Sequence, residues 1–207
     1  MTTATTRDRA IRGRGRPRDE AIDERIRTAT LELLAEQGYA ATTITAVARR
    51  AGVGTAALYR RWSSRTGLVE QAVFPGFPEL VLAPTGDLRG DVQRYVDAYC
   101  ELFATPAARA AMPGLISDYQ SDPGTPRHFG DRLAGSRVRE AFGALLAHDL
   151  AATGEGPAMD PDDALDVLIG AVMQHCFVRP FFGRATDNAY VTDAVVRAVR
   201  AVRAVRA

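Results

Sequence analysis

The chain has 207 residues, 46% of them hydrophobic and 25% charged, which is enough apolar mass for a sizeable core and excludes a fibrous or wholly disordered protein. The formal net charge is only +1, but residues 1–18 contain six arginines and one aspartate, so the charge is unevenly spread. A basic end on a mildly acidic body favours a polyanionic partner for that end, with a merely solvated tail as an equal alternative.

The cysteines and the apolar runs narrow the class further. Cys100 and Cys176 form no CxxC pair, so we predict neither a disulfide framework nor a zinc site, and Cys176, in an apolar stretch, is expected to be a small buried hydrophobe. No apolar leader follows the early charges, and no uncharged apolar run reaches about 18 residues. We therefore expect a cytoplasmic protein with no membrane span, no metal and no cofactor.

The N-terminal third divides into a basic arm and a helical domain. Residues 1–18 are rich in Thr, Arg and Gly without apolar periodicity, which predicts a disordered arm. Residues 19–74 are predicted to form one domain, because apolar residues recur there at helical spacing between capping and breaking residues. The expected helices cover about 19–37, 44–51, 55–62 and 64–74. We expect Gly38 to stop the first helix and Thr43 to cap the second.

From residue 75 onward the pattern stays helical, with no convincing alternating strand, so the fold class is predicted to be all-α with a C-terminal helical bundle over 75–207. The expected helices cover about 88–104, 106–121, 126–152, 160–178 and 190–206. The last helix carries an arginine every third residue. We interpret this row as a solvated helix end with cations near its negative pole, the alternative being a second nucleic-acid site.

Residues 43–62 carry the most informative spacing. Ala48 is small enough for two helices to approach, Gly52 permits the positive φ of a tight turn, and Val53 and Leu58 can anchor the second helix on the first. Two helices joined through such a turn form a helix-turn-helix, whose second helix can enter the major groove of DNA. An ordinary corner between two helices of a bundle is the alternative.

The wider stretch favours the DNA-binding interpretation. Residues 42–65 read TTITAVARRAGVGTAALYRRWSSR. This segment resembles the DNA-binding domain of the TetR (tetracycline repressor) family, which has a Thr-capped helix, then Ala-x-x-Ala-Gly-Val, Leu-Tyr-x-x-aromatic and Ser-Lys. The resemblance covers about residues 20–74 and implies an N-terminal three-helix helix-turn-helix domain that binds double-stranded DNA at a palindromic operator.

The resemblance also implies roles for single residues. Thr43, Tyr59 and Arg65 match positions that reach backbone phosphates, and Arg65 replaces the usual Lys with a bidentate donor. The groove-facing start of the recognition helix consists of Gly54, Thr55 and Ala56. Two further candidates for phosphate or base contacts are Arg60 and Arg61. Trp62 matches a packing aromatic. The sequence departs from the family at Ala57, which is often Thr, at Arg61, which is often aromatic, and at Thr66, which is often an acid, so the operator sequence is left open.

The arm contains a second signal. Arg14-Gly15-Arg16-Pro17 resembles the core of an AT-hook, an extended segment that lies in a narrow minor groove, where the concentrated negative potential attracts arginine. We favour minor-groove binding by Arg14 and Arg16 over an inert tail.

For the C-terminal half, the resemblance implies a homodimer that binds a small effector of unknown identity. The helix over 160–178 is apolar nearly all round, which predicts burial on most sides, and the valine row of the last helix could pair with it in a four-helix dimer seam. Candidate pocket residues are Tyr95, Tyr99, Phe103, Met112, Tyr119, Phe142, Met173, His175 and Phe177. The alternative for each of them is a plain core position, and a metal site built from the three scattered histidines is disfavoured.

Three functional classes compete on these observations. A ligand-responsive dimeric regulator, more often a repressor in this family, is favoured. An enzyme built on a helical bundle is disfavoured, because the sequence has no nucleophile elbow, metal-ligand spacing or phosphate loop. A thiol-based redox sensor using Cys100 or Cys176 is the third.

Deletion of residues 1–16 is expected to weaken operator binding and to lower the dependence of log K on log salt concentration, because arm arginines release counterions from DNA. Titrations of the full-length and shortened chains at several salt concentrations measure both quantities. An unchanged salt slope would show that the arm does not contact DNA.

Overall fold

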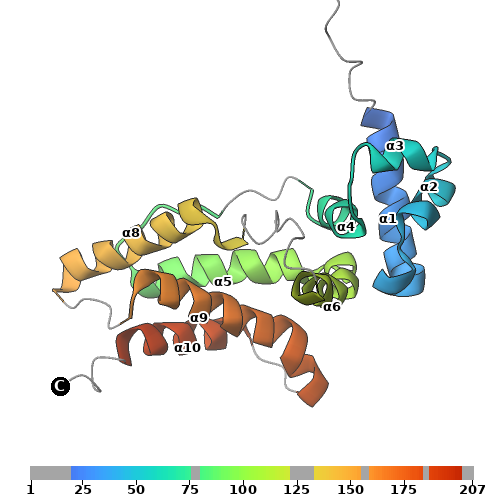
Figure 1. The fold of residues 1–207 in the computed structure, drawn as a ribbon. Coiled ribbons are helices and arrows are strands. Elements are labelled where there is room, and N and C mark those ends of the chain that lie inside the picture. The colour runs from blue at the N-terminus through green and yellow to red at the C-terminus, as the bar shows by residue number, and fades with distance from the viewer. Residues whose placement is uncertain (1–19, 76–79, 122–132, 155–158, 184–186, 202–207) are drawn as a thin grey trace, which may run out of the picture.

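The structure is a computed structural model that describes residues 20–75, 80–121, 133–154, 159–183 and 187–201. Every regular element in these ranges is a helix, which confirms the predicted all-α class (Figure 1). The basic arm, including Arg14 and Arg16, lies outside the described residues, as does the end of the predicted last helix.

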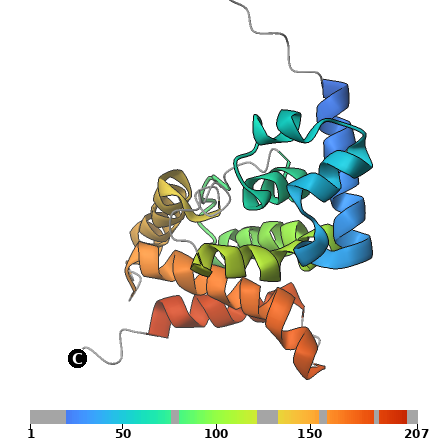
Figure 2. The same cartoon turned by 45° about the vertical axis from the view of Figure 1, so that its right-hand side comes forward.

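The helices form an N-terminal unit and a larger helical body. The N-terminal unit consists of α1 (Glu20–Ala41), α2 (Ile44–Ala51), α3 (Thr55–Tyr59) and α4 (Arg65–Val73). The body contains α5 (Leu88–Ala104), α6 (Pro106–Ser121), α8 (Ser136–Thr153), α9 (Pro161–Met173), the π-helix η1 (Gln174–Val178), the 3₁₀-helix η2 (Arg179–Phe182) and α10 (Asn188–Ala201). Helix α6 lies where the two parts meet, in contact with α1, α4 and α5 (Figures 1 and 2).

Local capping chemistry fixes the N-terminal unit as the sequence predicts. The Thr43 side chain accepts a hydrogen bond from the Ala46 N–H at 3.1 Å, and Ser64 caps α4 by accepting from the Gly67 N–H at 3.1 Å. Gly52 ends α2 with φ 65°, a left-handed conformation that glycine adopts without strain. The turn between α2 and α3 therefore has the geometry expected of a helix-turn-helix.

A small hydrophobic cluster of its own holds α2 and α3 on α1. Leu33 of α1, Val47 of α2, Leu58 of α3 and Leu68 of α4 meet there, each at least 98% buried. Full burial of such side chains stabilises a fold by about 1.5–3 kcal/mol each. Leu58 thus fixes the short helix α3, which has too few residues to be stable alone.

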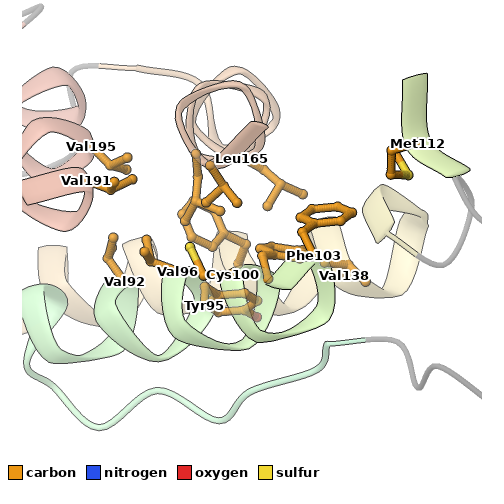
Figure 3. Close-up of a cluster of buried hydrophobic side chains, with 14 of the residues drawn as sticks. Val92, Tyr95, Val96, Cys100, Phe103, Met112, Val138, Leu165, Val191 and Val195 are labelled. Carbon is orange, nitrogen blue, oxygen red and sulfur yellow. The ribbon is translucent and has the colours of Figure 1, made fainter. Parts of the chain in front are cut away.

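The main core surrounds α5, which contacts α6, α8, α9 and α10. Figure 3 shows side chains of α5, among them Tyr95, Val96 and Phe103, directed toward the neighbouring helices. The Tyr95 ring meets Phe142 edge-on at 5.3 Å between centroids. The valine row of α10, Val191, Val195 and Val199, is buried in this core, so these valines pack within the chain and are not available for the dimer seam suggested from the sequence.

Several predicted boundaries need correction. Gly38 does leave helical geometry, with φ 75° and ψ −179°, but helical residues resume and α1 ends only at Ala41. Helix α3 ends at Tyr59 instead of residue 62, although Arg61 and Trp62 still donate their N–H groups to the Leu58 carbonyl at 2.8 Å. These tight bonds continue the turn without another α-helical residue.

Two predicted long helices are interrupted. Gly135 is extended, with φ −70° and ψ 174°, so the helix expected over 126–152 is not continuous and α8 begins at Ser136. The helix expected over 160–178 is α-helical only to Met173 and then widens into η1. It is also buried mainly on one side, since Leu165, Leu168 and Val172 are in the core while other positions remain exposed.

Residues Pro161–Phe182 form one helical stretch that is long and apolar enough, by length and composition alone, to cross a membrane. Core helices of soluble proteins pass the same test. Its inner side packs against α5 and α10, and its first turn carries the exposed aspartates Asp162 and Asp163.

Gly114→Ala is expected to lower stability by about 1–3 kcal/mol, the usual cost of overpacking. A Cβ at Gly114 of α6 would lie 2.0 Å from Cδ1 of Tyr39, whose ring is buried and whose hydroxyl donates to Asp118. Thermal and urea unfolding measure the change. Gly143→Ala is the matched control, because its Cβ would meet only Pro161 at an ordinary 3.5 Å. Equal effects of the two substitutions would contradict close packing of α6 on Tyr39.

Candidate nucleic-acid interface

The start of α2 and the whole of α3 present one exposed face. Thr43, Gly54 and Ala56 are exposed, and Thr55 is half-buried. Tyr59 is 56% exposed, a large value for an aromatic side chain. Since the Thr43 oxygen accepts the capping hydrogen bond, its hydroxyl hydrogen stays available to an external acceptor such as a phosphate.

The arginines around this face fall into two groups. Arg50 binds Glu32 at 3.1 Å and Glu36 at 2.7 Å, and these exposed carboxylates raise its pKa. Arg61 lies 3.3 Å from Asp23, at ion-pair distance without a hydrogen bond. Arg60, by contrast, is exposed and has no ion pair within the described residues. Of the arginines of α3 and the turn after it, only Arg60 can therefore meet a polyanion without giving up an internal partner.

Arg65 is engaged by the body of the protein. Its Nη2 donates to both carboxylate oxygens of Asp118 on α6, at 2.9 and 3.0 Å, and its guanidinium lies over the Tyr39 ring at 4.4 Å. The Tyr39 hydroxyl and the Thr66 hydroxyl also donate to Asp118, at 2.6 and 3.0 Å. Three residues of α1 and α4 thus converge on one carboxylate of α6.

The surroundings of this carboxylate shift two pKa values. Burial opposes ionisation of Asp118, but the hydrogen bonds from Tyr39, Arg65 and Thr66 outweigh it and lower the pKa of Asp118. Burial, aided by the bond to Asp118, raises the pKa of Tyr39 to about 12. At neutral pH Asp118 is therefore the charged acceptor and Tyr39 remains a neutral donor.

Most of the predicted pocket residues pack into the core. Tyr95, Tyr99, Phe103, Met112 and Phe142 are each at least 97% buried. Tyr119, Met173, His175 and Phe177 are half-buried. The Tyr99 hydroxyl donates to the Leu133 carbonyl at 2.6 Å, whereas the buried Tyr119 hydroxyl has no hydrogen-bond partner within the described residues.

Two hollows of the described surface have other linings. A groove of about 630 Å³ lies between the end of α9 and α10, and its lining residues are Ala171, Gln174, Arg179, Phe182, Tyr190, Val191 and Ala194. A second, of about 380 Å³, lies beside the start of α1 and includes the acidic Glu20, Asp23 and Glu24 together with Trp62. Met173 and His175 are the sequence neighbours of the lining residue Gln174, but neither of them lines the first groove.

Sequence reasoning missed the cluster at Asp118. Asp118 lies 79 residues from Tyr39 and 53 from Arg65, so no local pattern connects them. The available signals were indirect, namely the single acidic residue of α6 and an arginine at the start of α4. Trp62 was interpreted as a packing aromatic, and it does pack against the small cluster while its Nε1 donates to Gln71 at 2.6 Å.

Comparison with known proteins agrees with this geometry. Residues 26–72 match the model of bacterial regulatory proteins of the tetR family, and residues 82–199 match the model of tetracyclin repressor-like C-terminal domains. The uncharacterized HTH-type transcriptional regulator YdeS of Bacillus subtilis (strain 168) is 27% identical over 187 residues, which cover 89% of this chain and 91% of YdeS. Rv1556 of Mycobacterium tuberculosis, also an uncharacterized HTH-type regulator, is 42% identical over 72 residues, 34% of this chain and 36% of its own.

Solved structures show the same fold. The TetR family transcription regulator SCO0332 is 26% identical, with a TM-score of 0.56 over 86% of this chain and 96% of its own. FadR from Bacillus subtilis, crystallised in complex with stearoyl-CoA, shares the fold at 12% identity, with a TM-score of 0.54 over 86% of this chain and 98% of its own.

A capped helix-turn-helix with an exposed second helix, followed by a helical body, defines a DNA-binding transcriptional regulator. The C-terminal match alone spans more than half of the chain, and the protein belongs to the TetR family.

Asp118→Asn is expected to destabilise the protein by about 1–3 kcal/mol near neutral pH, because it weakens charge-assisted hydrogen bonds from three donors. A carboxyl whose pKa is lowered on folding stabilises the fold above its unfolded pKa of about 3.9 and loses that contribution as pH falls through the folded pKa. The gap between wild type and variant should therefore narrow below about pH 4.

Urea unfolding at a series of pH values measures this gap. Glu140→Gln, at an exposed position of α8, is the control and should track the wild type throughout. A gap of constant size down to acidic pH would show that Asp118 is not ionised in the fold.

Proposed function

We propose that this regulator is a homodimeric repressor that binds a palindromic operator and is released from it by a small, largely apolar ligand, in the cytoplasm. The observation that carries the proposal is the exposed face of α3 on an N-terminal unit whose helices α1 and α4 bind Asp118 of α6, and so the body of the protein. DNA is read at one end of this connection, and a ligand acts at the other.

The DNA contacts follow from exposure and charge. Gly54, Thr55 and Ala56 begin the recognition helix and are small enough to let its backbone approach the base edges. Thr43, Tyr59 and Arg60 flank them with phosphate donors. Arg61 and Arg65 can join the interface only by exchanging Asp23 and Asp118 for phosphate.

The dimer follows from apolar surface left outside the core. Phe181 and Phe182 of η2 are 85% and 70% exposed, and Tyr190 of α10 is exposed by about half. Exposed aromatic side chains at the edge of an apolar groove are typical of a protein interface. A second copy placed against the outer sides of α9 and α10 would bury them and set two copies of α3 on one face of DNA.

The ligand proposal rests on chemistry and on coupling. The aromatic residues of α5 and η1 offer an apolar environment. The buried Tyr119 hydroxyl, which has no hydrogen-bond partner in the part of the chain that the structure describes, offers a polar group to a bound molecule. The neighbouring fold of FadR accommodates stearoyl-CoA, a ligand with a long apolar chain. A ligand that displaces α6 would move Asp118, and with it α4 and α1, so the spacing of the two recognition helices would change.

In vitro selection of bound DNA tests the function, and is expected to return an inverted repeat with half-sites about one helical turn apart. On that DNA, Arg60→Ala should weaken binding and lower the salt slope by about two, since a dimer brings two copies of Arg60 to the phosphates. Failure to enrich any sequence would contradict the function itself.

Arg50→Ala is the matched control, because the Arg50 guanidinium is already held by Glu32 and Glu36. It should leave the slope unchanged. If Arg50→Ala lowered the slope as much as Arg60→Ala, the proposed orientation of α3 on DNA would be wrong. A molecule qualifies as the effector when it both weakens DNA binding and raises the melting temperature of the free protein.

A further inference from the structure

The two cysteines, 76 positions apart in the chain, face each other across the core. Their Sγ atoms are 3.8 Å apart, with Cys100 on α5 and Cys176 on the π-helix η1. Figure 3 shows Cys100 among the side chains that lie between α5 and the helix carrying Leu165. Both are free thiols in the structure.

The two thiols differ in access and in acidity. Cys100 is 91% buried, whereas Cys176 is half-buried, so a small reagent reaches Cys176 first. The hydrogen bond between the sulfurs lowers the pKa of Cys176 and the positive charge of Arg109 lowers it further, against the opposing effect of burial, whereas the same pairing and burial raise the pKa of Cys100. Cys176 is therefore the thiol that ionises first, with the Cys100 S–H able to donate to the thiolate.

The backbone at Cys176 departs from α-helical geometry. Residues Gln174–Val178 have the wider turn of a π-helix, a local irregularity that often marks functional sites in helices. Phe177 beside it contacts Phe103 edge-on at 5.3 Å, so η1 stays packed against α5. A disulfide requires the sulfurs to close from 3.8 Å to about 2.05 Å, a shift of less than 2 Å along a contact that already exists.

We propose that Cys100 and Cys176 form a reversible oxidation site, in which a hydroperoxide converts the thiol pair into an intramolecular disulfide. Cys176 is the attacking thiol, and Cys100 is the thiol that resolves the intermediate. This site is separate from the DNA-binding face. Its oxidation requires no ligand, but it lies on α5 and η1, the helices whose aromatic residues are proposed above to surround the ligand.

The chemistry balances in two steps. The Cys176 thiolate attacks one oxygen of the hydroperoxide, so that an S–O bond forms and the O–O bond breaks. The sulfur is oxidised by two electrons to a sulfenic acid. The other oxygen of the cleaved peroxide takes up a proton and leaves as water or an alcohol. The Cys100 sulfur then attacks the Cys176 sulfur, the S–S bond forms, and the departing hydroxide takes the Cys100 proton to leave as water.

The test treats reduced full-length protein with hydrogen peroxide, then alkylates under denaturing conditions and measures intact mass. Because the chain has only two cysteines, the outcome can be assigned directly. The expected product has lost two hydrogens, about 2 Da, takes up no alkyl group, runs as a single chain on a non-reducing gel and regains both thiols with dithiothreitol. Two fully alkylated thiols, or a disulfide between chains, would overturn the proposal.

Single variants separate a concerted pair from two independent thiols. In Cys176→Ala, loss of the Cys100 thiol should be slower by about tenfold or more, because the attacking thiolate is gone. In Cys100→Ala, a sulfenic acid should accumulate on Cys176 and be trapped by dimedone. Loss of the Cys100 thiol at the wild-type rate in Cys176→Ala, or the absence of a trapped sulfenic acid in Cys100→Ala, would show that the two thiols do not act together. The wild-type mass measurement stands even if one variant folds poorly.

Discussion

The carboxylate of Asp118 is the contact on which the arrangement of the two parts depends. Tyr39 and Arg65 donate to it from α1 and α4, and Thr66 adds a third hydroxyl donor. A half-buried charge of this kind is stable only when its lone pairs are satisfied, and here they are. The close approach of Gly114 to Tyr39 brings α6 near enough for these bonds to form. Packing and electrostatics therefore support the same junction.

This junction acts on the recognition helix through a rigid unit. Helix α3 has five residues and no stability of its own, and it is fixed by Leu58 in a cluster shared with α1 and α4. A movement of α6 that carries Asp118 along would pull both of those helices, and α3 would follow them. Because packed clusters shift as units instead of deforming continuously, the proposed ligand response requires that a small displacement at α6 turn the N-terminal unit as a whole.

The parts of the fold that sequence could predict are those set by local chemistry. Thr43 and Ser64 cap helices and Gly52 takes a positive φ, and each is legible from the residue type and its neighbours. The parts that failed depend on contacts distant in the chain. The row of α10 valines was assigned to a dimer seam, whereas Val191, Val195 and Val199 pack in the core and α10 lies against α5. The widening of α9 into η1 has no sequence signature. Cys100 and Cys176 were unrelated until the fold placed them together.

The electrostatics of the interface also depend on contacts between residues that are distant in the chain. Residues 19–70 contain seven arginines and seven acids, so their sum predicts no attraction for DNA. In the structure, Arg50 and Arg61 form ion pairs with acids of α1, and Arg65 forms one with Asp118. Within the described residues this leaves Arg25, Arg49 and Arg60 exposed without an ion pair, and Arg60 is the one that follows α3 directly. Coulomb attraction falls off within a Debye length, about 8 Å at physiological salt, so the position of one free guanidinium matters more to binding than the net charge of the unit. Arg65 adds a condition, because its charge becomes available to DNA only in a state where α6 releases it.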